Sequence, residues 1–192
     1  VLLGAWAGGE GIYRRILDIG TGTGLIALML AQRFSGAMIE GIEIDKAAAD
    51  ESDENMTNSP WSDRLKVIHA DFREIAAQTR KKYDLIVSNP PWYRHSLPAF
   101  NSERTLARHS VNLRVEEIIR FSRGLLTETG RLSIIVPAGG NEEEYAGNSG
   151  LFVRRKLRVV PSPGKAVKRV MFEFALRPGT PEEGKLIIEK GG

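Results

Sequence analysis

The sequence contains no cysteine and only three histidines, His69, His95 and His109. Without cysteine the chain forms no disulfide and uses no thiolate chemistry, which indicates a reducing compartment. The histidines are scattered and form no ligand pattern, so no metal site is predicted. No apolar run reaches the roughly 18 residues of a transmembrane helix. Residues 1–7 are too short for a signal peptide and lack its basic lead. We therefore expect a cytoplasmic protein, a monomer, with no metal and no membrane partner.

Acidic residues are also missing from one long stretch of the chain. The net charge is only +3, yet residues 145–172 contain no Asp or Glu, and a second basic group lies in 94–114. Stretches of one sign attract polyanions, although basic runs are commonly just solvated faces. We expect a nucleic acid to be held by a set of basic side chains. The predicted members are Arg94, Arg108, His109, Arg154, Lys165 and Lys168.

A glycine-rich turn follows the first predicted strand. Residues 16–24 read ILDIGTGTG. Glycines let the backbone approach a ligand closely, and the start of the next helix offers free N–H groups. A dinucleotide fingerprint reads G-x-G-x-x-G, whereas this turn reads G-x-G-x-G with an acid two residues before its first glycine. The pattern argues against NAD.

Acidic residues end the next two predicted strands. Glu43 and Asp45 follow the second strand, where a carboxylate can accept both hydroxyls of a ribose. Asp71 and Phe72 follow the third strand and suit an adenine, with an acid for the exocyclic amine and an apolar side chain for the ring. Such acids also cap helices and occupy turns. Acids at three successive strand ends, together with the glycine turn, indicate a nucleoside cofactor.

The fourth predicted strand runs into Asn89-Pro90-Pro91-Trp92, the predicted catalytic residues. Two prolines stiffen the turn because they fix φ near −65° and bias the preceding residues to extended geometry. Asn89 offers a side-chain carbonyl, Pro90 a backbone carbonyl, and Trp92 a face for stacking. Two carbonyls that accept the N–H bonds of a planar NH2 group would hold it and favour the charge that develops on its nitrogen. The alternative interpretation is a rigid strand-to-loop turn with a half-buried Trp.

Strands and helices alternate along the chain, as in a parallel sheet covered on both faces. The last two strands are joined by a connection too short for a parallel crossover, which predicts an antiparallel hairpin. Residues 93–112 show no period and are expected to form a substrate loop. The expected strands are 15–19, 37–42, 65–69, 84–88, 130–136, 152–160 and 170–176, with a further edge strand at 186–189. The expected helices are 25–34, 46–55, a short one after Phe72, 114–126 and a weak one at 141–148.

The order of these strand ends resembles the class I S-adenosylmethionine-dependent methyltransferases, from about Tyr13 to Leu176. The resemblance implies an α/β fold, a Rossmann-like seven-stranded sheet with a C-terminal antiparallel hairpin. It also implies that 1–192 is a single domain that binds S-adenosyl-L-methionine. The implied cofactor-binding residues are Asp18, Gly20, Thr21, Gly22, Gly24, Glu43, Ile44, Asp71, Phe72 and Asn89.

Four segments together resemble the bacterial tRNA1(Val) adenine-37 N6-methyltransferase family. They are 1–7, 54–61, 88–91 and Ala107-Arg108-His109. The chain departs from that family at Trp92, where Tyr or Phe is usual, and in having no Thr-Asp-Gly lead before Val1. We expect that this lead is missing here and that, where present, it covers part of the cofactor pocket. The resemblance implies methylation of N6 of adenine in tRNA.

The Asn-Pro-Pro-aromatic motif leaves other functions open, because it also occurs in methyltransferases for cytosine N4, guanine N2 and protein glutamine. A protein-glutamine N5 methyltransferase and an rRNA base-amino methyltransferase are the nearest alternatives. A non-catalytic RNA-binding domain of the same fold is an alternative of another class. The basic stretches and the Ala107-Arg108-His109 segment favour an RNA substrate.

Overall fold

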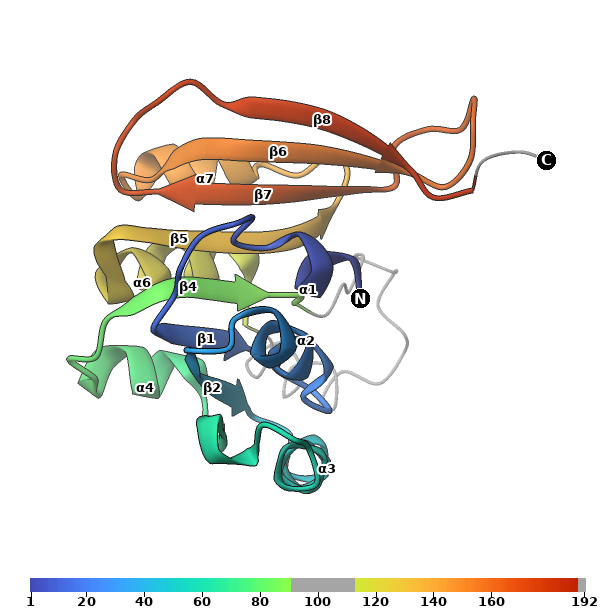
Figure 1. The fold of residues 1–192 in the computed structure, drawn as a ribbon. Coiled ribbons are helices and arrows are strands. Elements are labelled where there is room, and N and C mark those ends of the chain that lie inside the picture. The colour runs from blue at the N-terminus through green and yellow to red at the C-terminus, as the bar shows by residue number, and fades with distance from the viewer. Residues whose placement is uncertain (91–112, 190–192) are drawn as a thin grey trace, which may run out of the picture.

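The computed structural model describes residues 1–90 and 113–189. Within them one sheet of eight strands has the order β3-β2-β1-β4-β5-β7-β6-β8 (Figure 1). The expected Rossmann-like sheet is confirmed, and its eighth strand overlaps the further edge strand that the sequence predicts beyond the seven. The strands are β1 (Arg15–Ile19), β2 (Met38–Glu43), β3 (Leu65–His69), β4 (Tyr83–Ser88), β5 (Leu126–Pro137), β6 (Phe152–Val160), β7 (Arg169–Ala175) and β8 (Glu182–Ile187).

Strands β3, β2, β1, β4 and β5 are parallel. The strand order reverses at β1: β2 and β3 are added on one side of it, and β4 and β5 on the other. β1 pairs with β2 on one side and with β4 on the other. The carboxyl ends of parallel strands meet at one edge of a sheet, and a crevice opens there where the strand order reverses. The glycine turn after β1 and the Asn-Pro turn after β4 therefore lie next to each other.

Side chains alternate between two cores on opposite faces of the sheet. Ile16 and Leu85 belong to the core under α1, α2 and the end of α3, whereas Leu17 and Ile86 belong to the core under α4, α6 and α7. This period of two is what a doubly covered sheet requires. The helices are α1 (Leu2–Trp6), α2 (Leu25–Arg33), α3 (Lys46–Thr57), α4 (Phe72–Gln78), α6 (Val115–Leu125) and α7 (Glu142–Asn148), with a short 3-10 helix at Ser62–Arg64.

The C-terminal strands close the sheet with the expected antiparallel pair. β7 runs antiparallel to both β5 and β6. The edge strand expected at 186–189 begins earlier, at Glu182, and lies parallel to β6. Its acidic start was no strand signal in the sequence, but Glu183 pairs with Arg158 of β6 at 2.8 Å. β5 also begins earlier than expected, at Leu126, directly after α6.

Helix α1 was not expected from the sequence. The Arg33 guanidinium of α2 donates to the carbonyls of Gly4 and Ala7, both at 2.8 Å, and to that of Gly9 at 3.0 Å. From the C-terminal strands, Arg155 stacks on the Trp6 ring at 4.4 Å. Five residues are too few to form a helix alone, so α1 depends on these distant side chains.

The buried face of α2 differs from the one that helical periodicity predicts. Periodicity in the sequence places Leu25, Leu28 and Met29 on one face of this helix, but the fully buried side chains of α2 are Ala27, Leu30 and Ala31, and Leu25 is 49% exposed. Leu25 instead borders the cavity described below. No helix in 1–90 or 113–189 is long and apolar enough to cross a membrane.

Candidate active site

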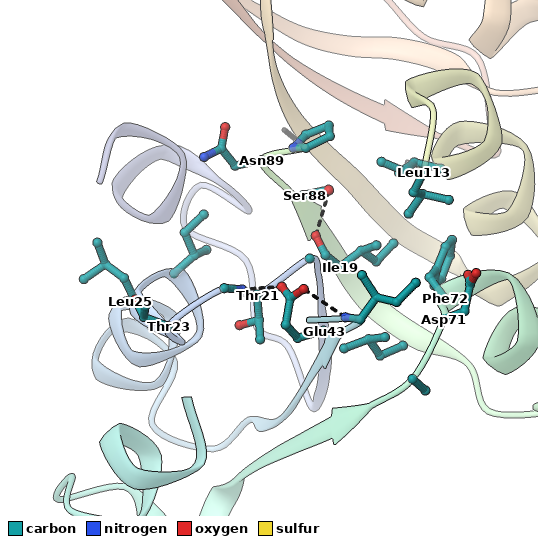
Figure 2. A pocket seen from close by; sticks show the side chains of 18 of the residues that line it. Ile19, Thr21, Thr23, Leu25, Glu43, Asp71, Phe72, Ser88, Asn89 and Leu113 are labelled. Atoms are coloured by element: carbon teal, nitrogen blue, oxygen red, sulfur yellow. Dashed lines mark hydrogen bonds between the residues drawn. The ribbon is translucent and has the colours of Figure 1, made fainter. Parts of the chain in front are cut away.

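A cavity of about 460 Å³ opens at the carboxyl edge of the sheet, where β1 and β4 end side by side. This volume is within the usual range for small-molecule sites. Figure 2 shows Thr21 and Glu43 between two groups of side chains, with Leu25 on one side and Asp71, Phe72 and Leu113 on the other. The wall is formed by Val1, Ile19, Gly20, Thr21, Gly22, Thr23, Leu25, Ile26, Ile42, Glu43, Ile44, Ala70, Asp71, Phe72, Ser88, Asn89, Pro90, Leu113 and Ile118.

The glycine turn contributes bare backbone to this wall. Gly20 and Gly22 have φ angles of 67° and 57°, which side chains rarely adopt. A Cβ added to either glycine would meet no atom within 4 Å. The space beside the turn is therefore open, and a ligand can approach its backbone closely.

Glu43, at the end of β2, is held by three backbone N–H groups. Its Oε2 accepts from Gly22 at 2.9 Å, and its Oε1 accepts from Ile44 at 2.9 Å and Asp45 at 3.0 Å (Figure 2). A carboxylate has about four acceptor positions. The side chain is thus fixed before any ligand arrives, and it keeps acceptor capacity for a hydroxyl.

Asp18 lies behind the turn and is fully buried. Its Oδ2 accepts from the Thr21 hydroxyl at 2.7 Å, and its Oδ1 has no hydrogen-bond partner among the described residues. Burial raises the pKa of the Asp18 carboxyl to about 7; the hydrogen bond from Thr21 and the nearby Ala27 N–H oppose this rise, and the charge of Glu43 adds to it. Asp18 braces the turn from below through the hydrogen bond that it accepts from Thr21.

Asp71 and Phe72 form the far side of the cavity, together with the start of α6. Asp71 is the N-cap of α4 and accepts from the Arg73 N–H at 2.8 Å. The capping interpretation of this acid is thus confirmed, and the same residue also borders the cavity. Leu113 and Ile118 complete an apolar surface around Phe72.

Ser88 and Asn89 join β4 to the turn after β1. The buried Ser88 hydroxyl donates to the Ile19 carbonyl at 2.8 Å, and Asn89 follows at the edge of the cavity (Figure 2). Pro90 is buried and Asn89 is exposed. This bond ties the strand end that carries Asn89 to the strand that leads into the glycine turn.

Most of the predicted cofactor residues border one cavity. Asp18 and Gly24 do not border it, and their direct contact with a cofactor stays a prediction. Pro91, Trp92, Arg94, Arg108, His109 and the expected loop 93–112 lie outside the described residues. The residues that the sequence did not assign to the site include Thr23, Leu25, Ile26, Ser88, Leu113 and Ile118. Most are apolar, and such side chains read simply as core in a sequence.

The basic C-terminal stretch is partly neutralised by acids from other segments. Lys156 pairs with Glu143, and Arg155 lies 3.5 Å from Glu173 and 3.7 Å from Glu182. Arg158 pairs with Glu183, so three of the basic side chains of β6 form ion pairs. The acid-free stretch in the sequence is therefore less positive in space than it reads.

The predicted nucleic-acid residues of this stretch are separated by β6. Lys165 and Lys168 lie in the loop between β6 and β7, at the same edge as the end of β5, because Pro137 pairs with Arg169. Arg154 lies at a bulge near the start of β6, about 20 Å away along the strand. Among the described residues none of the three has an ion-pair partner. Only the two lysines lie toward the cavity edge.

Comparison with known proteins agrees with this geometry. Residues 9–145 match the family model of the methyltransferase small domain. The chain is 43% identical over 192 residues to a tRNA1(Val) (adenine(37)-N6)-methyltransferase of Bacteroides fragilis, covering 98% of this chain and 80% of that protein. The chain belongs to this methyltransferase family. A protein of the same description from Flavobacterium psychrophilum is 41% identical over 191 residues, covering 98% of this chain and 82% of the relative.

A solved structure shows the same fold. A predicted O-methyltransferase from Agrobacterium tumefaciens superposes with a TM-score of 0.68 at 18% identity, covering 100% of this chain and 88% of that one. At this identity the likeness concerns the fold alone. The superposition supports the Rossmann-type assignment made from the sequence.

Proposed function

We propose that this protein is an S-adenosylmethionine-dependent methyltransferase that methylates N6 of an adenine in tRNA, at position 37 of a valine tRNA. The observation that carries the proposal is one cavity that brings together the glycine turn, Glu43, Asp71 and Asn89 from the ends of four strands. The family of the chain supplies the reaction class.

The residues of the cavity fit S-adenosylmethionine chemically. When bound, this cofactor supplies an electrophilic methyl group on a sulfonium centre. The open space beside Gly20 and Gly22 accommodates a ligand against bare backbone. Glu43 has acceptor capacity for a ribose hydroxyl, and the apolar surface of Phe72, Leu113 and Ile118 suits an adenine ring with Asp71 at its edge.

Asn89 and Pro90 act on the substrate amine. Their carbonyls accept its N–H bonds, hold its nitrogen at the cavity edge and stabilise the positive charge that develops there. No strong general base is needed, because the methylated nitrogen gives up its proton readily to water. The Ser88 bond to Ile19 keeps these carbonyls in register with the glycine turn.

Lys165 and Lys168 support a polyanionic substrate at this edge, since basic side chains near a site hold nucleic-acid phosphates. A single domain over 1–192, a monomeric state and a cytoplasmic location stay predictions from the sequence. No cluster of three or more potential metal ligands occurs in the described part of the chain.

Mass spectrometry of nucleosides tests the function directly. tRNA and rRNA are incubated with the protein and isotopically labelled cofactor, then digested. Label in N6-methyladenosine from valine tRNA is the expected result. Label in another base, in rRNA only or in protein glutamine would select one of the alternative methyltransferases, and no label would favour a non-catalytic RNA-binding domain.

Thermal unfolding tests the cofactor separately. S-adenosylhomocysteine should raise the melting temperature, because a ligand that prefers the native state stabilises it by mass action. Protection by NAD and not by S-adenosylhomocysteine would contradict the assignment.

A further inference from the structure

Two strands in the C-terminal part of the sheet carry a polar pair on the face that α1 covers. Ser133 of β5 and Glu173 of β7 lie opposite each other in the sheet, and both are buried. Two residues away along these strands, Ile135 and Met171 belong to the core that also contains side chains of α1 and α2. Side chains two apart in a strand point to the same face. A carboxylate is therefore buried on the α1 side of the sheet.

Glu173 is satisfied in part by the N-terminal segment. Its Oε2 accepts from the Gly8 N–H and from the Ser133 hydroxyl, both at 3.1 Å. The Nη1 of Arg155 lies 3.5 Å from the same oxygen, and only 5% of the Glu173 side chain is exposed. A buried carboxylate is costly unless its charge is paired and its oxygens accept hydrogen bonds. Displacing the N-terminal segment would take one donor away from Glu173.

Arg155 holds the same segment at the end of α1. Its guanidinium stacks on the Trp6 ring at 4.4 Å, and its Nη1 donates to the Trp6 carbonyl at 3.4 Å. Gly8 lies so close to the sheet that an added Cβ would be 3.1 Å from Leu85 of β4. In Figure 1 the segment after α1 crosses β5 and β4 on its way to β1. The end of α1 is therefore fixed by residues 149 and 165 positions away in the chain.

The start of α1 lies at the cavity. Val1, the N-cap of α1, is part of the cavity wall. Gly4 packs against α2, because an added Cβ would be 2.7 Å from Sδ of Met29. α1 thus shares the α2 face of the sheet, whereas Phe72 belongs to the core on the other face. Figure 2 shows Leu25 of α2 across the cavity from Phe72, so α1 stands at the half away from the predicted adenine site.

We propose that Arg155 and Glu173 are positioning residues for the amino-acid part of the cofactor. With the adenine at Asp71 and Phe72 and the ribose at Glu43, the rest of S-adenosylmethionine extends toward the half of the cavity that α1 borders. A helix of five residues does not form alone, so the position of α1 depends on its anchors. The C-terminal strands thereby contribute to cofactor affinity without touching the cofactor. The inference rests on the proposed function, because it needs this cofactor in the cavity.

Arg155→Gln breaks the anchor, and Arg158→Gln is the matched control. Both arginines lie on β6 and near an exposed acid of β8: Arg155 is 3.7 Å from Glu182, and Arg158 is 2.8 Å from Glu183. The two substitutions therefore remove similar contacts to β8. Three positions apart in a strand, the two side chains point to opposite faces. Only Arg155→Gln removes contacts to Glu173 and to α1.

Calorimetry with two ligands separates positioning from general stability. S-adenosylhomocysteine carries the amino-acid part, whereas 5′-methylthioadenosine shares the adenosine and the sulfur but lacks that part. Arg155→Gln should weaken S-adenosylhomocysteine about fivefold, on the scale of one lost hydrogen bond, because fewer molecules hold α1 in place. It should weaken 5′-methylthioadenosine by less than about twofold. Arg158→Gln should leave the affinity for both ligands unchanged.

Hydrogen exchange tests whether the loss passes through α1. In Arg155→Gln the amides of residues 5–9 should exchange faster, whereas those of β1 should be unchanged. Trp6→Leu is a second variant, which removes the ring on which Arg155 stacks and keeps an apolar side chain. It should produce the same selective loss, and it decides the test if Arg155→Gln does not fold.

Three results would overturn the proposal: equal weakening of both ligands, no weakening in either folded variant, or selective weakening without faster exchange in α1. Failure of both ligands to bind the unaltered protein would contradict the proposed cofactor and, with it, this inference. Binding of both ligands without a selective loss in the variants would contradict the inference alone.

Discussion

The two halves of the sheet satisfy their charged groups in different ways. At the ends of β2 and β3, Glu43 and Asp71 accept hydrogen bonds from backbone N–H groups, and Asp71 also contacts the guanidinium of Arg73, two residues along the chain. In β6 to β8, Arg155 and Arg158 are paired with acids from other strands. Local backbone contacts fix an acid in one orientation and leave it acceptor capacity, whereas cross-strand ion pairs neutralise charge. The first half is therefore suited to bind a ligand, whereas most of the region from β6 to β8 is suited to close the sheet.

The largest expected effect lies in the first half, at Asn89. Asn89→Ala should reduce turnover by about 100-fold or more, the scale seen when one preorganised polar contact to developing charge is lost. Affinity for S-adenosylhomocysteine should barely change. Single-turnover methylation of tRNA, with calorimetry for the cofactor, measures both quantities. Turnover like that of the unaltered protein would reduce the Asn-Pro turn to a structural element.

Glu43 tests whether the acids at the strand ends bind a ligand or only brace the turn. Glu43→Ala should weaken the binding of S-adenosylhomocysteine by roughly 1–3 kcal/mol, because a charge-assisted hydrogen bond to the ribose is lost. Asp45→Ala is the matched control. Asp45 caps α3 through the Ala48 N–H at 2.9 Å and does not border the cavity. It should lower the melting temperature but not the affinity, and equal affinity losses in the two variants would count against a ribose contact.

Asp18 should make stability depend on pH. Its pKa is about 7 in the folded protein and 3.8 ordinarily, so between these values the folded state binds a proton that the unfolded state has lost. The contribution to stability therefore falls as pH rises from about 4 to about 7, by at most roughly 1.4 kcal/mol per unit.

Asp18→Asn removes this titration. Urea unfolding at several pH values should show the variant gaining stability relative to the unaltered protein as pH rises through that window. A difference between the two proteins that stays constant with pH would mean that Asp18 does not carry a raised pKa.

The smallest expected effect concerns the loop between β6 and β7. Changing Lys165 and Lys168 to Gln should weaken tRNA binding severalfold. Each lost phosphate contact should also reduce the slope of log K for tRNA binding against log salt concentration by about 0.7–0.9. Arg154→Gln serves as the comparison, since Arg154 lies near the other end of β6. The sequence predicts that all three residues bind tRNA, whereas their placement leads us to expect the larger change from the lysines. If the variants and the unaltered protein bound tRNA with equal affinity at each of two salt concentrations, all three residues would be part of a solvated face.

The sequence by itself determined the order of the elements and which strand ends border the cavity. β1, β3 and β6 begin and end where the sequence predicts, because apolar runs, glycines and strand-end acids are local signals. For the same reason Glu43, Asp71 and Asn89 could be assigned to one cavity, since parallel strands bring their carboxyl ends to the same edge.

Only the tertiary structure decided the remaining features. α1 depends on Arg33 and Arg155, and β8 pairs its acids with β6. The burial of Asp18 depends on segments far apart in the chain, and so do the ion pairs of Arg155 and Arg158. Charge and burial are properties of neighbours in space, and a sequence orders residues only along the chain. Which charges remain available for a ligand is therefore settled by packing.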